Sequence, residues 1–504
     1  MKKLLIGWAE KTLVHEKKIS LYGQFFERIS QYVESEITAT AMAVESSGDS
    51  MILVSADLTG IPDFLMTLVR EKVAAKNSEI DTKKIIIAAT HTHTSHTLGN
   101  PIPSVIDSFT TSIEILKEFM KEGQDYSPAV TADDSVLDPT EATYFVAEQI
   151  SEAVVEAWKN RSEALYANEF GRAAVGMCRR VGYTDGTSEM WGDTNTADFT
   201  ALEGGNDSGV ELLYTFDKNK KLVGVVANIA CPSQVLEQRS FISADYWGRA
   251  KANLREKLGN EVYLLGLGGA GGDQCPRDLI RWIEPETPID DPNVKRPNPI
   301  RRKADPSTYD ISGCKKIAKR ISNEIISVLE DITEYKDEAL LVHEVKTLTL
   351  PLRKATKTEY NHAVREIEYF VEKNKDKGEF NFEDNAQLFV HAGLIERFRM
   401  QQFTETVDVE SHIVRFGDVA FATNPFELFL DFGNRIKARS YAAQSFIVQL
   451  CCGCAGYLPT EKAEKAGHYS AYISSGVVGH EGGDLLVREQ LKSINGMFNI
   501  NEIK

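Results

Sequence analysis

Three of the ten histidines of this 504-residue chain stand close together in the segment THTHTSHT, residues 90–97. They follow the apolar run KKIIIAA, which is typical of a buried strand. Side chains alternate across a strand, so His91 and His93 are expected on one face. Two imidazoles there would form half of a metal site, supported by His96. The alternative is a set of unrelated histidines bonded to loop backbone.

A second candidate site is the glycine-rich segment GLGGAGGDQCPRD, residues 266–278. It follows the apolar run EVYLL and formally satisfies the G-x-G-x-x-G pattern of dinucleotide-binding folds. That pattern requires a helix to follow, whereas Pro276 begins a proline-rich stretch. A turn that brings backbone N–H groups and Asp273 to a ligand is therefore favoured. Cys275 stands where a nucleophile, or a side chain facing an oxyanion, could be presented.

The cysteines indicate a reducing compartment. There are seven of them, an odd number without a disulfide-type framework, so free thiols and a cytoplasmic location are expected. Cys451, Cys452 and Cys454 form the cluster CCGC, which could bind a metal ion. No second cysteine pair accompanies this cluster, so a small-residue turn after a buried strand is the preferred interpretation.

The composition is that of an ordinary globular protein, with 42% hydrophobic and 26% charged residues. The formal net charge of −17 opposes binding to a phosphate backbone, so nucleic acid is not an expected partner. No apolar stretch reaches the length of about eighteen residues that a membrane span needs. Glu10 and Lys11 interrupt the apolar start of the chain too early for a secretory signal. Nothing indicates the oligomeric state.

The elements that must position these residues alternate between strand and helix. Apolar runs at 51–58 and 83–90 flank a helical pattern at 63–76, and a second such unit spans 221–269. Each is a β-α-β pattern, which implies parallel pairing covered by helices. Further expected elements are helices at 140–158 and 312–331, a strand at 339–353, and a polar helical region to about 404. We therefore predict an α/β fold with mixed or parallel sheets flanked by helices.

The domain prediction is one large unit, residues 1–504, with two lobes at 1–335 and 336–504. Seven of the sixteen prolines stand between Pro276 and Pro306. Residues 276–310 are accordingly expected to form an irregular excursion that covers the site.

Six segments together resemble the neutral/alkaline non-lysosomal ceramidase family. They are AATHTHTSHT, VVANIACPSQVLE, FISADYWGRAKANLREKLG, GGAGGDQCPR, ATNPFELFLDFGNRIKARS and GYLPTEKAEKAGHYSA. The likeness runs almost end to end, and the order and spacing of the segments are more specific than any single motif. The chain looks most like the shorter bacterial ceramidase-like proteins that consist of the catalytic domain alone.

The resemblance implies a zinc-dependent amidohydrolase. Ceramidases of this family cleave an N-acyl bond, and the match implies that His91, Glu427 and Tyr457 are metal ligands. His93 would lie beside the metal as a general acid or as an orienter of water. Zinc lowers the pKa of a bound water and polarises an amide carbonyl, and an imidazole can move protons near neutral pH.

Three departures from the family pattern qualify this expectation. The segment NIACPSQ lacks the second zinc histidine, and no histidine stands between His96 and His343, so Cys231 is the nearest replacement ligand. The serine that faces the scissile amide in the family is Cys275 here, and Arg277 adds a positive charge that suits an anionic or polar substrate. We also expect neither the secretion signal nor the C-terminal domain of the secreted enzymes, so ceramide is not the expected substrate.

Two functions follow from these residues. The first is a hydrolase that cleaves an amide or related bond of a small polar or conjugated metabolite, with Zn²⁺ or another divalent transition metal. The second is a non-catalytic, ligand-binding relative on the same fold. For the hydrolase, the expected metal ligands are His91, Glu427, Tyr457 and Cys231; the reaction centre is His93, Asp273 and Cys275; and the substrate contacts are Arg180, Arg277 and Gly272.

Overall fold

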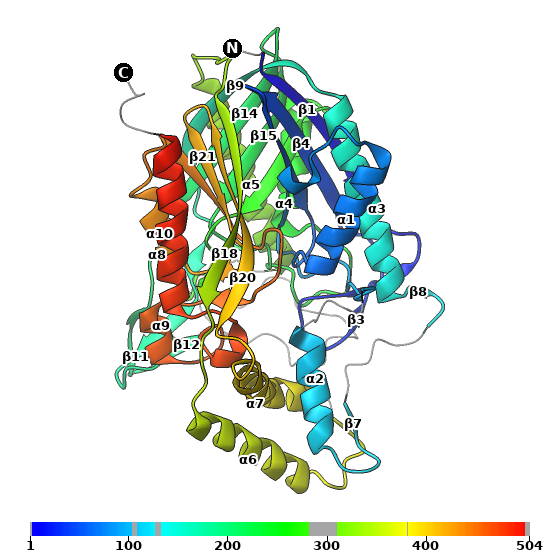
Figure 1. Ribbon diagram of the computed structural model, residues 1–504, viewed down its shortest axis with the longest axis vertical. Coiled ribbons are helices and arrows are strands. Elements are labelled where there is room, and N and C mark those ends of the chain that lie inside the picture. Colours follow the sequence, from blue (N-terminus) through cyan, green and yellow to red (C-terminus); the bar gives the residue numbers. More distant parts are fainter. Residues whose placement is uncertain (1–2, 103–107, 127–132, 282–309, 381, 499–504) are drawn as a thin grey trace.

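The structure is a computed structural model that describes residues 3–102, 108–126, 133–281, 310–380 and 382–498. Two β-sheets pack face to face between two layers of helices (Figure 1), so the predicted α/β fold with helix-flanked mixed sheets is confirmed. The helices against the first sheet are α1 (Asp63–Lys76), α3 (Pro139–Lys159), α4 (Asp245–Leu258) and α5 (Asp310–Glu330). Those against the second are α8 (Leu430–Lys437) and α10 (His480–Met497).

The first sheet has eight strands in the order β16-β15-β14-β9-β1-β4-β5-β6. Their bounds are β1 (Leu5–Thr12), β4 (Thr38–Ser46), β5 (Asp49–Ala56), β6 (Ile85–Ala89), β9 (Ser162–Arg172), β14 (Gly209–Asp217), β15 (Leu222–Ile229) and β16 (Tyr263–Gly268). The two edge pairs, β5 with β6 and β15 with β16, are parallel, as both β-α-β patterns predicted. The interior pairs are antiparallel.

The first sheet curls until its two parallel ends approach each other. Ser55 Oγ on β5 donates a hydrogen bond of 2.6 Å to the carbonyl oxygen of Gly266 on β16. The carboxyl ends of both parallel pairs are thereby brought to the same side of the molecule. A local sequence pattern can predict the pairs but cannot predict this closure, because it depends on the twist accumulated over all eight strands.

The second sheet has the order β18-β20-β21-β23. Its strands are β18 (Leu341–Pro351), β20 (Thr406–Phe416), β21 (Val419–Thr423) and β23 (Gln444–Val448), with β21 and β23 parallel. Its inner face shares one apolar core with the first sheet. Asn228 of the first sheet reaches across and donates to the carbonyl of Ile447 at 2.9 Å. The two sheets therefore pack together through a shared apolar core.

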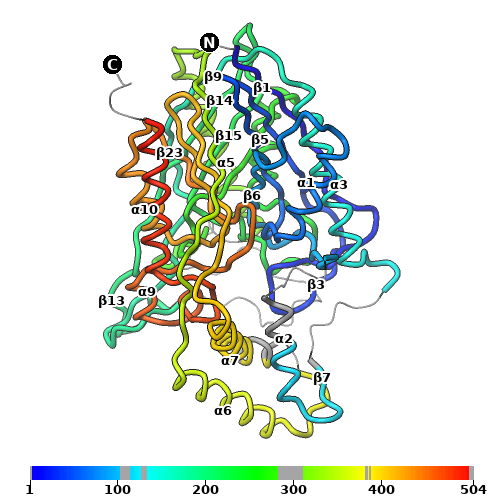
Figure 2. Tube along the Cα trace, in the orientation of Figure 1, coloured from blue at the N-terminus to red at the C-terminus, as the bar shows by residue number. Residues whose placement is uncertain are grey.

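A helical extension lies below the sheets in Figures 1 and 2. It consists of α2 (Ser108–Phe119), α6 (Lys357–Lys373) and α7 (Phe382–Met400), which enclose a separate apolar cluster. Helix α6 begins with a capping box between Thr356 and Glu359. The predicted boundary between 335 and 336 falls between α5 and β18, and the division into two lobes stays a prediction. The predicted excursion lies mostly in residues 282–309, outside the described residues.

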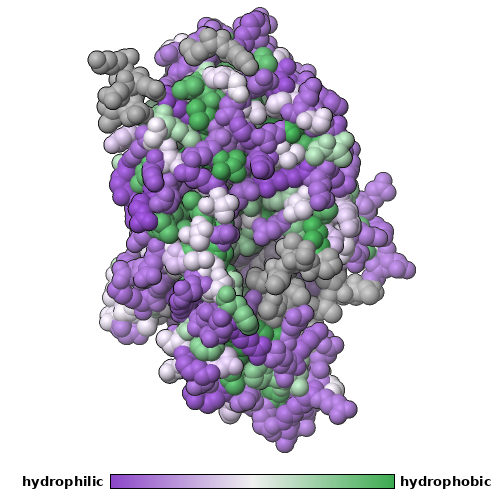
Figure 3. Space-filling view, in the orientation of Figure 1, coloured by the Kyte–Doolittle hydropathy of each residue, from purple (hydrophilic) through white to green (hydrophobic). Residues whose placement is uncertain are grey.

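Short elements complete the edge at which the sheet ends meet. Those around it are β10 (Met177–Cys178), β11 (Arg180–Tyr183), β12 (Ser188–Met190), β13 (Phe199–Leu202), β17 (Gln274–Cys275), β22 (Glu427–Leu428), β24 (Tyr457–Leu458) and α9 (Glu461–Ala466). Elsewhere lie β2 (Lys18–Leu21), β3 (Arg28–Ile29), β7 (Asp125–Tyr126), β8 (Val136–Leu137) and β19 (Glu379–Phe380). Polar residues cover most of the face seen in Figure 3. Among the described helices, none has both the length and the apolar character needed to cross a bilayer.

Candidate active site

The candidate site lies where the carboxyl ends of parallel strands from both sheets meet. His91 and His93 follow β6, Glu237 follows β15, and Arg277 follows β16. Glu427 opens β22, shortly after β21. Ligands bind at the carboxyl ends of strands in open α/β sheets. The fold thus brings residues that are far apart in the sequence to the edge where a ligand is expected.

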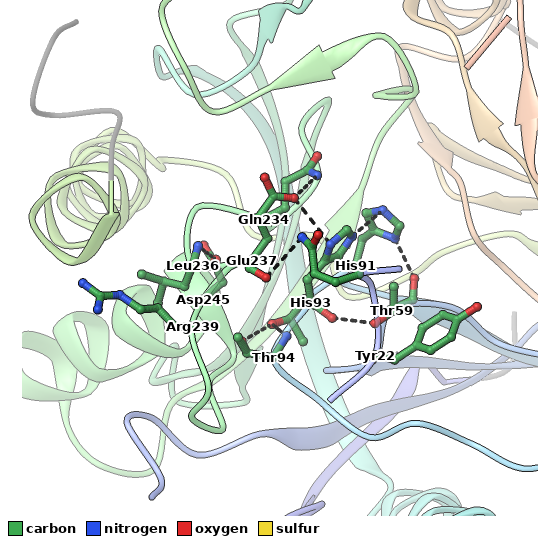
Figure 4. A network of polar contacts seen from close by, with 12 residues as sticks. Tyr22, Thr59, His91, His93, Thr94, Gln234, Leu236, Glu237, Arg239 and Asp245 are labelled. Atoms are coloured by element: carbon green, nitrogen blue, oxygen red, sulfur yellow. Dashed lines mark hydrogen bonds and ion pairs between the residues drawn. The ribbon is translucent and has the colours of Figure 1, made fainter. Parts of the chain in front are cut away.

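His91 presents one defined nitrogen to the site. Its Nδ1 lies 2.6 Å from the carbonyl oxygen of Thr59, so Nδ1 carries a proton and, in the neutral ring, Nε2 has the lone pair (Figure 4). Nε2 lies 3.5 Å from Oε2 of Glu427. The residue has a φ of 65°, in the left-handed region. A backbone turn at His91, rather than continued strand alternation, therefore aims this ring.

His93 meets the first ring and completes what we call the histidine pair, His91 and His93. The two Nε2 atoms are 3.2 Å apart, and the other ring nitrogen of His93, Nδ1, lies 3.5 Å from Oε2 of Glu237. Burial and the neighbouring imidazole hold the pKa of His93 well below its usual range. Arg28 fixes the loop by donating to the carbonyl of His93 at 2.6 Å. A Cβ on Gly23, at φ 104°, would clash with the His93 ring, so only glycine fits there.

Glu427 and Tyr457 stand side by side because β22 and β24 pair in parallel with these two residues in register. Arg179 lies against both: one terminal guanidinium nitrogen is 3.3 Å from the Tyr457 hydroxyl and 3.9 Å from Oε2 of Glu427. Burial and the Glu427 carboxylate raise the pKa of Tyr457 well above its usual value, so the phenol keeps its proton. A buried cation, a carboxylate and a phenol donor therefore share this corner.

Arg179 replaces Arg180 as the guanidinium at the site. Arg180 points the other way, where it forms two bonds to Glu203 at 2.8 and 3.0 Å and donates to the carbonyls of Tyr469 and Gly467. It is fully buried and committed to holding this loop region together. The sequence RR offers two adjacent arginines, and the short strands β10 and β11 decide which of them faces the site. Nothing in the local pattern distinguishes them.

Asp273 and Cys275, the predicted reaction-centre residues of the glycine-rich turn, mainly stabilise the conformation of that turn. Asp273 accepts a hydrogen bond of 2.9 Å from the backbone N–H of Leu430, at the start of α8, and burial raises the pKa of Asp273 to about 6. Cys275 donates to the carbonyl of Arg277, and burial raises the pKa of this thiol to about 12. A protonated thiol is a poor nucleophile, so the geometry gives Cys275 a packing role.

The remaining predicted residues separate into two groups. Gly272 packs its backbone against Glu427, where a Cβ would lie 2.3 Å from the Glu427 carbonyl oxygen, so it shapes the turn. Arg277 faces the site, 3.7 Å from Glu237 and stacked over the Trp191 ring at 4.9 Å. Cys231 is fully buried and donates to the carbonyl of Pro232. Burial raises its pKa well above the usual range.

Sequence reasoning missed three polar residues that the structure places here. Gln234 accepts from Arg179 at 3.0 Å and donates to Glu237 at 3.2 Å, so it links the two charged groups (Figure 4). Tyr469 packs edge-on against Tyr457, with the two ring centroids 5.5 Å apart. Gln234 and Glu237 lie in the segment PSQVLE, which has no periodic pattern to mark a functional face. Its position directly after a buried strand was the available signal.

A second polar cluster lies away from this edge, and we call it the sheet cluster: Glu410, His412, Cys452, Arg70 and His343. Within the described parts of the chain, Glu410, His412 and Cys452 are the one group of three His, Cys, Asp or Glu residues whose ligand atoms all lie within 4.8 Å of one another. Arg70 binds both oxygens of Glu410, at 2.5 and 2.9 Å. The CCGC segment thus places Cys452 against a charged network rather than in a plain turn.

Comparison with solved structures shows the fold. The chain is similar to the neutral ceramidase of Pseudomonas aeruginosa, with a TM-score of 0.66 and 15% identity over 98% of this chain and 74% of that one. It is similar also to a ceramidase complexed with C2, with a TM-score of 0.63 and 13% identity over 99% and 76% of the two chains. No family model matches the sequence, and neither does any curated protein. At these identities the likeness establishes a ceramidase-like fold.

Proposed function

We propose that this protein is a metal-dependent hydrolase that cleaves an amide or related bond of a small polar or conjugated metabolite. The observation that carries the proposal is the lone pair of His91 Nε2, fixed by Thr59 and facing Glu427 at 3.5 Å on the ligand-binding edge of a ceramidase-like fold. The solved neighbours are ceramidases, which supports hydrolysis as the reaction class. Ceramide itself is not the substrate we expect.

The donor atoms at this corner suit Zn²⁺ or a similar divalent ion. His91, Glu427 and Tyr457 offer an imidazole nitrogen, a carboxylate oxygen and a phenol oxygen, and nitrogen and oxygen ligands of this kind are those of catalytic zinc sites. The carbonyl of Thr59 orients the His91 ring in the way that partners of metal-bound histidines do. When bound, the ion would polarise the scissile carbonyl and activate a water molecule.

The surrounding side chains would stabilise the charge that develops during hydrolysis. Arg179 is buried and its pKa is raised, because Tyr457 and Glu427 outweigh the effect of its burial, so it stays a cation. It can donate hydrogen bonds to a negatively charged oxygen in the transition state. In a site closed to water such preorganised donors act more strongly than in solution.

Arg277 and Trp191 support a polar or conjugated substrate. The guanidinium of Arg277 lies over the indole ring and 3.7 Å from Glu237, which together form a charged and aromatic wall. Such a wall can recognise a carboxylate, a sulfonate or a hydroxylated group and can stack against a planar one. It is ill suited to two long hydrocarbon chains, which would leave these charges buried without partners.

The alternative is a ligand-binding relative without catalysis. It is favoured by Cys231 and Cys275, whose buried thiols are protonated and offer neither a thiolate ligand nor a nucleophile. In that case the same pocket would bind a small polar molecule and release it unchanged.

Hydrolysis assays on the full chain separate the two functions. The chain would be stripped of metal and reloaded with zinc. It would then be offered N-acyl amides and esters of polar groups, with ceramide for comparison. We expect turnover that requires metal and that falls about 100-fold in kcat for Arg179→Gln. His362→Gln, at a surface histidine with a 58% exposed side chain, is the matched control for His91→Gln, which should lose activity. Binding of the same compounds without turnover would favour the alternative.

A further inference from the structure

Two side chains of opposite charge lie together at the site, beside His93. Arg277 has a terminal guanidinium nitrogen 3.7 Å from Oε1 of Glu237, which is too long for a hydrogen bond. Neither side chain is fully buried: that of Arg277 is 15% exposed and that of Glu237 is 13% exposed. The two groups therefore attract each other without a direct hydrogen bond, and both stay partly accessible. We call Glu237 and Arg277 the charged pair.

The carboxylate of Glu237 is held on one oxygen and open on the other. Gln234 donates to its Oε2 at 3.2 Å, and the Gln234 amide is itself oriented because it accepts from Arg179 at 3.0 Å (Figure 4). Among the described residues, no donor lies within hydrogen-bond distance of Oε1. A carboxylate oxygen readily accepts hydrogen bonds, so a ligand that brings an N–H or O–H donor to Oε1 would be favoured.

Trp191 places Arg277 close to the reaction corner. The Arg277 guanidinium lies 4.9 Å from the centre of the indole ring, and the Arg179 guanidinium lies 5.8 Å from it. The backbone N–H of Trp191 donates to the Arg179 carbonyl at 2.8 Å, and its φ of 61° lies in the left-handed region, which is rare for a bulky residue. Such backbone conformations persist where the surrounding structure enforces them, and they cluster at ligand sites. The charged pair and the corner at Arg179 therefore share one wall.

The charged pair disfavours a ligand group of a single charge. A lone carboxylate bound to Arg277 would also meet the Glu237 carboxylate, and a lone ammonium bound to Glu237 would meet the Arg277 cation. A zwitterion satisfies both charges at once. In an α-amino acid the ammonium nitrogen and the carboxylate carbon are about 2.5 Å apart, so one such group fits against two charges separated by 3.7 Å.

We propose that Glu237 and Arg277 recognise the ammonium and the carboxylate of an α-amino acid head group on the substrate. The inference rests on the proposed function and deepens it, because it names the substrate class: an amide whose remote end is a free amino acid, as in a diamino acid acylated on its side-chain amine. The His93 ring alone separates the charged pair from His91, with Nδ1 3.5 Å from Glu237 and Nε2 3.2 Å from His91 Nε2. A few methylene groups can therefore join the head group to the scissile amide.

The test compares the zinc-loaded full chain on four acetamides of matched length. Nε-acetyl-lysine has both charges, 6-acetamidohexanoate has the carboxylate alone, N-acetylcadaverine has the ammonium alone, and N-pentylacetamide has neither. We expect kcat/KM for Nε-acetyl-lysine to exceed that for either singly charged probe by about 10- to 100-fold, the effect of one hydrogen bond to a charged group. A second set, one methylene group shorter, starts from Nδ-acetyl-ornithine.

Two variants assign the two charges to the two residues. Arg277→Gln should abolish the preference for probes that carry a carboxylate, and Glu237→Gln should abolish the preference for probes that carry an ammonium group. A merely structural role would instead lower kcat/KM by the same factor for all four probes. Arg281→Gln, at a nearby arginine with a 79% exposed side chain, is the matched control and should keep both preferences. Circular dichroism would establish that each variant is folded.

The outcomes distinguish this inference from the function on which it rests. If the wild-type chain hydrolyses all probes of both sets with similar kcat/KM, or if both variants keep the wild-type preferences, the head-group assignment is refuted and the hydrolase stands. Calorimetry on the same probes gives a second measurement. Tighter binding of the zwitterionic probe, dependent on both residues but without turnover, would support the assignment and refute the hydrolase. Neither binding nor turnover of either zwitterionic probe would refute the assignment.

Discussion

The histidine pair and the sheet cluster are built from similar side chains but differ in how completely their polar atoms are paired. In the sheet cluster, His412 bonds Glu410 through Nε2 and His343 through Nδ1, each at 2.8 Å, and His343 bonds the Ser50 carbonyl at 3.1 Å. No buried nitrogen or oxygen of these described side chains lacks a partner, whereas Nδ1 of His93 does. A saturated network rigidifies the fold, whereas an unpaired buried nitrogen is costly unless a water molecule or an ion pairs with it.

The largest expected effect is on the free energy of unfolding, and it tests whether the sheet cluster stabilises the fold. Glu410→Ala leaves Arg70 and the fully buried His412 without their shared carboxylate, and a buried charge that loses its partner costs about 3 kcal/mol. Urea unfolding followed by fluorescence would measure the change. Asp408→Ala, at an exposed residue of the same strand, is the control and should change stability by less than about 0.5 kcal/mol. Equal losses in the two variants would contradict a stabilising role for the sheet cluster.

Metal should stabilise the protein through the histidine pair alone. A ligand that binds only the folded chain, present at 100 times its Kd, adds about 2.7 kcal/mol to the free energy of unfolding. We expect zinc to raise the stability of the wild-type chain by this amount and a chelator to reverse it. The same increment should persist in Glu410→Ala and vanish in His91→Gln. Loss of the increment in Glu410→Ala, with His91→Gln unaffected, would move the metal site to the sheet cluster.

Acid should weaken the sheet cluster in a defined range. Burial alone would raise the pKa of Glu410, but hydrogen bonds from His412 and Arg70 outweigh it and lower the pKa from 4.5 to about 2. The contribution of this carboxylate is therefore present above pH 4.5 and is lost as the pH falls toward 2. We expect the stability difference between wild type and Glu410→Gln to shrink over that range by about 1 kcal/mol, because the group is partly exposed. A stability difference between the two proteins that stays constant from pH 5 to 2.5 would contradict the lowered pKa of Glu410.

The smallest effect concerns the thiols. Interaction with Cys451 and His412 lowers the pKa of Cys452 in spite of its burial, so it is the more reactive thiol in principle. Cys454 is exposed and Cys452 is buried. Native-state alkylation followed by mass spectrometry should modify Cys454 first, and Cys454→Ser should change stability by less than about 0.5 kcal/mol. Modification of Cys452 at a similar rate would mean that the sheet cluster opens to solvent.

The sequence predicted the local units of the fold better than the site. The runs IIIAA and VYLLGLG were long and apolar enough to identify both parallel pairs and the helices between them. The curl of the first sheet and its antiparallel centre depend on contacts between distant strands, which periodicity does not encode. At the site, the end of a strand indicated His91 and the family resemblance indicated Glu427, but the choice of Arg179 over Arg180 and the placement of Glu237 depend on loop geometry. Asp273 was expected to face a substrate, whereas its environment makes it a helix cap.

The pairing of β22 with β24 has a consequence for how the protein is made. His91, His93, Glu237 and Arg277 all precede the second sheet in the chain, whereas Glu427 comes before its last strand, β23, and Tyr457 comes after it. During synthesis on a ribosome, the first sheet is translated in full before either of the last two residues exists. The nascent chain therefore lacks the carboxylate of Glu427 and the phenol of Tyr457 until its last strands emerge and pack against the first sheet.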